Sequence, residues 1–138
     1  MCIRDRRKLQ DTVSFPGVVR REEALRMQRD ACVQLFFETE AIEGVTTGKL
    51  YEYLASGRPI WRISQRADSD SARIIHDSAT GINAPTEPVS LARMLAQVAR
   101  QRPTLKPDPT QVARHARSSI AAKLVKSLER EFSNQRTS

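Results

Sequence analysis

The sequence predicts an α/β fold with a doubly wound, mostly parallel sheet that carries helices on both faces. Strand and helix patterns alternate along most of the 138 residues. Residues 32–37 form a largely apolar run, which is typical of a parallel strand buried on both faces. A second strand pattern at 59–63 directly follows a helical segment, as expected for a strand, helix, strand unit with a right-handed crossover.

The first third of the chain supplies the first such unit. Residues 12–15 predict a short strand, which ends at the Pro-Gly pair after it. Residues 21–29 predict a helix with acidic residues in its first turn and with Leu25 facing inward. The run at 32–37 is then the next strand.

The middle of the chain continues the alternation. After a loop at 38–46, the sequence predicts a helix over 49–56. Gly57 suits the left-handed conformation that commonly ends a helix. Pro59 then opens the strand at 59–63, because proline is tolerated at the first residue of a strand.

A further helix and a short strand complete the predicted sheet. The helix begins near residues 68–69 and closes at Gly81, with Ala72 and Ile75 on its inner face. Residues 82–84 then form an edge strand, which ends the sheet.

The remainder of the chain is predicted to be helical. A helix runs from Pro88 or Val89 to Ala99, and a proline-punctuated connector follows at 101–109. Apolar residues then recur at every fourth place, which indicates an amphipathic helix that we expect to pack on the body of the domain. They are Val112, Ala116, Ile120, Leu124, Leu128 and Phe132.

The sequence divides into one ordered lobe and its flanks. Residues 1–10 are rich in arginine and lack an apolar period, so we expect a leader that is non-native or disordered. Residues 11–109 form the α/β lobe, 110–133 the amphipathic helical segment and 134–138 a disordered tail.

Composition excludes several classes of protein. With 39% hydrophobic residues the chain supports one domain, and it contains neither an apolar run of membrane-spanning length nor a secretory leader pattern. Cys2 and Cys32 are predicted to form neither a disulfide framework nor a metal site, and Cys32 is expected to fill the core. His76 and His115 stand apart from any nucleophile and acid. No metal, cofactor or catalytic residue is therefore assigned, and a cytoplasmic protein is expected.

The formal charge of +7 is concentrated near the C-terminus. Residues 98–138 contain nine Lys or Arg against Asp108, Glu129 and Glu131. Aromatic residues make up only 5% of the chain, so base stacking is poorly supported and no specific nucleic acid is expected as a partner. Two interpretations of this basic segment stay open: a solvated helix face, and peripheral contact with the inner face of an anionic membrane.

Residues 44–60, GVTTGKLYEYLASGRPI, combine features of an anion and sugar site. The Thr-Thr-Gly turn at 46–48 offers backbone amides and a hydroxyl N-cap at a helix start, where the dipole favours an anion. Lys49 adds a full charge. Glu52 lies one helical turn beyond Gly48, so it is expected to face the same crevice and accept hydrogen bonds from vicinal hydroxyls such as those of ribose.

This segment resembles the C-terminal, donor-binding lobe of GT-B glycosyltransferases, most closely the retaining group 1, or family 4, enzymes that use sugar nucleotides. The shared residues are Thr47-Gly48-Lys49, Glu52-Tyr53 and Gly57-Arg58-Pro59-Ile60. The resemblance implies a Rossmann-like lobe that is incomplete at its N-terminus. It also implies a hexosyltransferase-like enzyme, associated with cell-envelope polysaccharide, whose fragment is inactive without its N-terminal acceptor lobe.

The resemblance implies roles for individual residues. The loop and helix start meet the diphosphate of a nucleoside-diphosphate sugar, and Glu52 binds its ribose; the donor-binding candidates are Thr47, Gly48, Lys49, Leu50 and Glu52. Glu43 and Gly44 are candidate sugar contacts, although the family spaces its two glutamates eight apart and Glu43 lies nine before Glu52. The candidate nucleobase loop is Val18, Val19 and Arg20. The family's closing helix crosses to the other lobe, which implies that part of the apolar stripe lacks a partner here.

Three alternatives stay open. A sugar-nucleotide epimerase shares the architecture and the diphosphate site. A basic nucleic-acid or membrane-surface module would make the Gly-Lys turn incidental. A response-regulator-like or generic nucleotide-binding domain ranks last, because Glu38, Glu40 and Glu43 gather without an aspartate. A Walker-type NTPase is excluded, because Lys49 is not followed by Ser or Thr.

Overall fold

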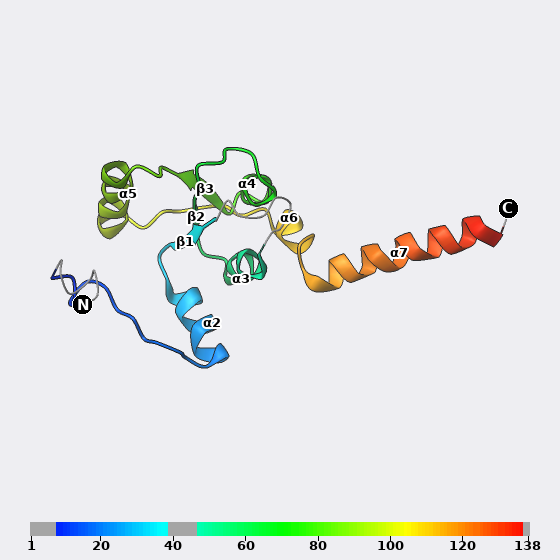
Figure 1. Cartoon of the computed structure of the whole chain (residues 1–138), viewed down its shortest axis with the longest axis horizontal. Coiled ribbons are helices and arrows are strands. Elements are labelled where there is room, and N and C mark those ends of the chain that lie inside the picture. The colour runs from blue at the N-terminus through cyan, green and yellow to red at the C-terminus, as the bar shows by residue number, and fades with distance from the viewer. Residues whose placement is uncertain (1–7, 39–46, 137–138) are drawn as a thin grey trace.

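The computed structural model describes residues 8–38 and 47–136. This part of the chain is an α/β protein with six helices and a parallel sheet of three strands (Figure 1). In chain order the elements are α2 (Arg21–Asp30), β1 (Gln34–Phe37), α3 (Gly48–Ser56), β2 (Ile60–Ile63), α4 (Asp70–Asp77), β3 (Gly81–Ala84), α5 (Pro88–Arg100), α6 (Pro109–Ala113) and α7 (Arg117–Arg136).

The sheet has the order β1-β2-β3, and both pairs of strands are parallel. These three strands confirm the predicted strands at 32–37, 59–63 and 82–84. The sheet is compatible with a Rossmann-like fold, and it is too small to distinguish a doubly wound lobe from other parallel α/β sheets.

The strand predicted at 12–15 is wrong. These residues form part of a turn and then irregular backbone, with the amide of Val13 bonded to the carbonyl of Leu9 at 2.8 Å. Phe15 is 64% exposed, so no burial of its side chain compensates for ordering an extended segment. In the described part of the chain the sheet consists of β1, β2 and β3, and residues 12–15 are not a strand of it.

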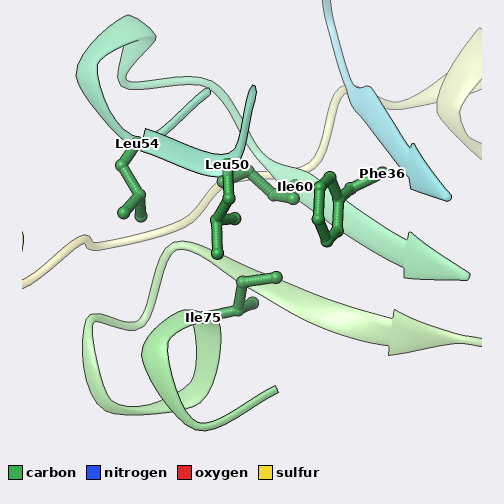
Figure 2. Packing of buried hydrophobic residues seen from close by; sticks show 5 residues of the cluster. All are labelled: Phe36, Leu50, Leu54, Ile60 and Ile75. Atoms are coloured by element: carbon green, nitrogen blue, oxygen red, sulfur yellow. The ribbon is translucent and has the colours of Figure 1, made fainter. Parts of the chain in front are cut away.

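The core lies on the face of the sheet that α3 and α4 cover. Alternation along the strands places Phe36 and Ile60 on this face, where they meet Leu50 and Leu54 of α3 and Ile75 of α4 (Figure 2). All five side chains are at most 4% exposed. Burying a side chain of this size contributes about 2 kcal/mol, so this cluster holds α3 at a defined position on the sheet.

The opposite face is only partly covered. Trp61 and Ile82 lie on this face, beside α5 and the connector. A cavity of about 610 Å³, with Met94 and Val98 on its wall, separates these two strand residues from α5. α5 therefore lies on this side of the sheet without packing closely on the strands. Phe37 at the end of β1 is 64% exposed, so burial on both faces does not extend to this edge strand.

Local signals place the helix ends. α3 ends at Gly57, whose φ of 68° confirms the predicted left-handed residue. α4 begins after Ser69, whose side chain accepts a hydrogen bond from the amide of Ala72, and Ala72 and Ile75 are buried as predicted. This helix ends at Asp77 rather than at Gly81, which is the first residue of β3.

The C-terminal helices differ from the prediction in their packing. Val112 of α6 packs against the core, whereas α7 extends away from the sheet as a single long helix (Figure 1, orange to red). The expectation that the apolar stripe packs on the body of the domain is therefore wrong for its C-terminal part, where Leu124 and Phe132 are 60% and 63% exposed. Residues 134–136, predicted to be disordered, continue α7.

None of the helices in the described ranges combines the length and apolar character that a membrane crossing requires.

Candidate functional site

Gly48 and Glu52 line the same cavity, as their spacing predicts. The cavity has a volume of about 530 Å³ and lies between α2, α3 and the junction of α6 with α7. Gly48 opens α3 and Glu52 stands one turn further along, so both lie on the helix face that looks toward α2. The wall of the cavity includes Arg21, Leu25, Gln28, Arg29, Gly48, Tyr51, Glu52, His115 and Arg117.

The carboxylate of Glu52 is held loosely by three donors. Arg21 Nη1 lies 3.4 Å from Oε1, and Gln28 Nε2 and Lys49 Nζ lie 3.4 and 3.5 Å from Oε2. These distances are at the long end for hydrogen bonds, and the side chain is 31% exposed. The carboxylate therefore keeps capacity to accept hydrogen bonds from a ligand in the cavity.

Glu52 is held in its ionised form. Burial raises the pKa of this carboxyl, but the hydrogen bond from Gln28 and the charges of Lys49 and Arg21 outweigh it, so the pKa lies below its usual value. An ionised carboxylate only accepts hydrogen bonds. The group therefore suits a ligand that presents hydroxyl donors.

The other three donor-binding candidates, Thr47, Lys49 and Leu50, do not line the cavity. Lys49 is paired with Glu52, and its Nζ stands 5.4 Å from the centre of the Tyr53 ring, so its charge faces these groups. The side chain of Leu50 is fully buried in the core, and its amide donates to the carbonyl of Thr47 at 3.1 Å. Leu50 therefore offers no side chain to a ligand.

Thr47 is the N-cap residue of α3, but its side chain makes no capping hydrogen bond. The predicted hydroxyl cap is therefore wrong for Thr47, and Thr46 lies outside the described residues. An uncapped helix start leaves first-turn amides available to another acceptor, which an anion at Gly48 would supply. Glu43 and Gly44, the candidate sugar contacts, also lie outside the described residues.

The candidate nucleobase loop does not line this cavity. Val18 and Arg20 are exposed and Val19 is half-buried, while Arg21, the next residue, contributes to the wall. The loop therefore approaches the cavity only through its connection to α2.

Several cavity residues were missed by sequence reasoning. Gln28 lies two turns beyond Arg21 on α2, so helical spacing could have placed both on one face. Tyr51 and His115 form a ring pair, with centres 6.1 Å apart and planes tilted by 34°. Burial, followed by the charges of Lys123 and Arg114, lowers the pKa of His115. No local pattern indicates this pair, because the two residues are distant in sequence.

A second polar cluster surrounds Arg62 at the carboxyl ends of the strands. The guanidinium is 1% exposed and donates to Glu38 Oε2 from Nε at 2.8 Å, to Asn83 Oδ1 at 2.9 Å, to the carbonyl of Arg66 at 2.7 Å and to Ser69 Oγ at 3.0 Å. Because these partners come from the ends of β1, β3 and the start of α4, the cluster joins those elements. An arginine in the apolar strand IWRI is the signal that could have indicated it.

Glu38, the partner of Arg62, is also held ionised. Burial raises the pKa of this carboxyl, but hydrogen bonds from Ser71, Arg62 and Ser69 outweigh that effect and bring the pKa below its usual value. The interactions of Arg62 satisfy its charge within the protein. We assign the cluster a structural role.

No group of three or more His, Cys, Asp or Glu side chains in residues 8–38 and 47–136 is arranged to hold a metal ion. No protein-family model matches the chain, and neither the curated proteins nor the solved structures include a match. The function is therefore inferred from the residues of the cavity.

Proposed function

We propose that this chain is the donor-binding lobe of a GT-B glycosyltransferase, with the doubly wound architecture of that class. The lobe binds a nucleoside-diphosphate sugar, and an N-terminal lobe supplies the acceptor. The observation that carries the proposal is the shared cavity of Gly48 and Glu52. A helix start and an ionised carboxylate on one wall suit the phosphate and ribose parts of one ligand.

Glu52 is proposed to bind the ribose. Its carboxylate is ionised and its present donors stand 3.4 to 3.5 Å away. Two vicinal hydroxyls would make shorter, charge-assisted hydrogen bonds to the two carboxylate oxygens. The long contacts to Arg21 and Gln28 weaken at little cost when such a ligand enters.

The diphosphate is proposed to lie near Gly48. Arg21, Arg29 and Arg117 line the cavity, so their guanidinium groups outnumber the single carboxylate of Glu52. During sugar transfer, negative charge builds on the departing diphosphate, and preorganised donors at that position lower the barrier. Lys49 contributes through its field at the helix start.

The first test is a calorimetric titration with uridine, guanosine and cytidine diphosphates. Glu52→Gln should weaken binding of the preferred nucleotide about tenfold, because a charge-assisted hydrogen bond is lost. The matched control is Glu22→Gln, which removes the same charge from the first turn of α2, where Glu22 is exposed and does not line the cavity. This control should leave binding unchanged.

A nucleotide without ribose hydroxyls separates the ribose role from general electrostatics. The 2′,3′-dideoxy diphosphate should bind the unchanged protein about tenfold more weakly, and Glu52→Gln should weaken it no further. Equal weakening of both nucleotides by Glu52→Gln would contradict a ribose contact. Tight, salt-dependent retention on DNA that Glu52→Gln leaves unchanged would instead favour a basic nucleic-acid module.

A further inference from the structure

The long helix α7 exposes a continuous apolar surface. Figure 1 shows that it leaves the body of the protein, and the large apolar side chains along it are exposed by about half or more. The exposed fractions are 46% for Ile120, 60% for Leu124, 52% for Val125, 48% for Leu128 and 63% for Phe132. We call these five residues the α7 stripe.

A cluster of basic side chains lies opposite the α7 stripe. At about 100° of rotation per residue, the stripe covers an arc of roughly 140°, and Lys123, Lys126 and Arg130 fall within roughly 60° on the other side. Glu129 lies about 40° beyond one border of the stripe. Glu131 falls inside the stripe, about 20° from its other border, where a tilt of the side chain brings its carboxylate to water.

We propose that α7 lies in the surface of an anionic lipid bilayer, with the α7 stripe in the acyl boundary and Lys123, Lys126 and Arg130 toward the headgroups and water. An interfacial helix has this division into an apolar face and a face rich in Lys and Arg. The net charge of +7 complements an anionic surface. With 20 residues, α7 extends about 30 Å along the membrane plane.

A lipid surface fits these observations better than a second copy of the chain. A two-helix seam uses a narrow row of apolar positions, whereas the α7 stripe is wider than such a seam. Association of two copies would also bring together two chains of charge +7. The inference needs only α7 and does not depend on the donor site.

The test measures flotation of the 138-residue chain with lipid vesicles. We expect it to bind phosphatidylcholine vesicles that contain phosphatidylglycerol, and to bind pure phosphatidylcholine at least about tenfold more weakly. The triple variant Lys123→Gln, Lys126→Gln, Arg130→Gln should lose about tenfold in affinity for the anionic vesicles, because the headgroup field reaches these charges within a Debye length.

The apolar contribution is tested by the pair Leu124→Gln and Leu128→Gln. Both leucines are exposed, so the fold is retained and only insertion of the stripe is lost, with an expected loss of about tenfold or more. Leu95→Gln is the matched control, since Leu95 is 41% exposed on α5 and the chemical change is the same. Vesicle binding of this control should equal that of the unchanged protein.

A fluorescent reporter on α7 tests whether the α7 stripe enters the lipid bilayer. The single native tryptophan, Trp61, is only 5% exposed, so Phe132→Trp adds a signal that responds to the surroundings of α7. The emission of this variant should shift to the blue with anionic vesicles and be quenched by brominated lipid.

Three results would overturn the proposal. The first is a lack of vesicle binding at low salt. The second is binding that the leucine pair leaves unchanged, which would place the contact on the body of the protein. The third is a dimer, detected by sedimentation, that the double variant Leu124→Gln, Leu128→Gln dissociates, together with a Phe132→Trp emission that does not change when vesicles are added. That result would assign the stripe to a second copy of the chain.

Discussion

At the scale of single residues, Arg62 shows how one buried charge joins several elements. Its guanidinium contacts Glu38 after β1, Asn83 in β3 and Ser69 at the start of α4. Ser69 also donates to Glu38 at 3.1 Å, so removal of the arginine leaves Glu38 with this hydrogen bond but without the guanidinium that balances its charge. Removing one partner of a buried ion pair is strongly destabilising, because the other charge is left uncompensated.

We therefore expect Arg62→Met to lower the free energy of unfolding by about 3 kcal/mol. Urea denaturation followed by circular dichroism measures this loss. Arg93→Met is the control, because Arg93 is exposed on α5 and its loss should change stability by less than about 0.5 kcal/mol. The double variant Arg62→Met, Glu38→Met should recover part of the loss, since no unpaired carboxylate remains. Equal effects of Arg62→Met and Arg93→Met would contradict the structural role.

Stability should also depend on pH through Glu38. Its pKa is lower in the folded protein than the usual 4.5, so the unfolded chain binds more protons as the pH falls. The contribution of Glu38 is present above 4.5 and is lost as the pH falls below this value through the folded pKa. Unfolding free energies measured by urea across this window should fall less steeply for Glu38→Gln than for the unchanged protein. The exposed control Glu22→Gln should retain the full slope.

The candidate site illustrates what sequence spacing predicts at this scale. The placement of Gly48 and Glu52 on one side of a helix follows from roughly four residues per turn and needs no tertiary information. The contacts of Glu52 with Arg21 and Gln28 join two helices, so they depend on how α2 packs on α3. The pattern of residues within one segment cannot predict these contacts between two helices.

At the scale of elements, β2 and β3 approach each other closely at Gly81. A Cβ built on Gly81 would overlap the carbonyl oxygen of Ile60, its partner in the sheet. This contact is with backbone, which cannot rotate away as a side chain does. The glycine is therefore required by the pairing of two strands, not by a turn.

Gly81→Ala should destabilise the protein by about 2 kcal/mol or more, because the strands must separate to admit the methyl group. Gly48→Ala is a matched control: its Cβ would meet no atom within 4 Å, and Gly48 lies in the first turn of α3. The control should leave stability unchanged or raise it by about 0.5 kcal/mol. Thermal unfolding of the two variants measures the difference, and a stable Gly81→Ala protein would contradict the observed strand spacing.

One of the four predicted strands is absent from the structure, and the reason is physical. α2, α3, α4 and α5 were predicted from apolar periodicity and end signals, which are properties of one segment. The strand predicted at 12–15 was wrong because a strand also requires a paired neighbour, and four residues carry no information about one.

At the scale of the whole molecule, the apolar side chains divide into a small core and an exposed helix. Leu50 is fully buried between α3 and the sheet, while Leu124 on α7 is 60% exposed. The two leucines are indistinguishable in a hydrophobic pattern. Their contributions to stability should nevertheless differ several-fold.

Leu50→Ala should cost about 3 kcal/mol in the free energy of unfolding, from lost burial and the cavity left behind. Leu124→Ala should change it by less than about 0.5 kcal/mol. Chemical denaturation of both variants in the absence of lipid provides the comparison. A large loss for Leu124→Ala would show that α7 packs on the body of the protein in solution.

The sequence by itself determined the alternation of helices and strands, the parallel sheet, the ends of α3 at its glycines and the shared helix face of Gly48 and Glu52. These features follow from backbone geometry and from periodicity within one segment. Only the tertiary structure decided that Arg62 is buried, that Arg21 and Gln28 meet Glu52, and that α7 leaves its apolar stripe uncovered. Such outcomes depend on which segments come together, and the free energy of those contacts belongs to pairs of elements that no single stretch of sequence encodes.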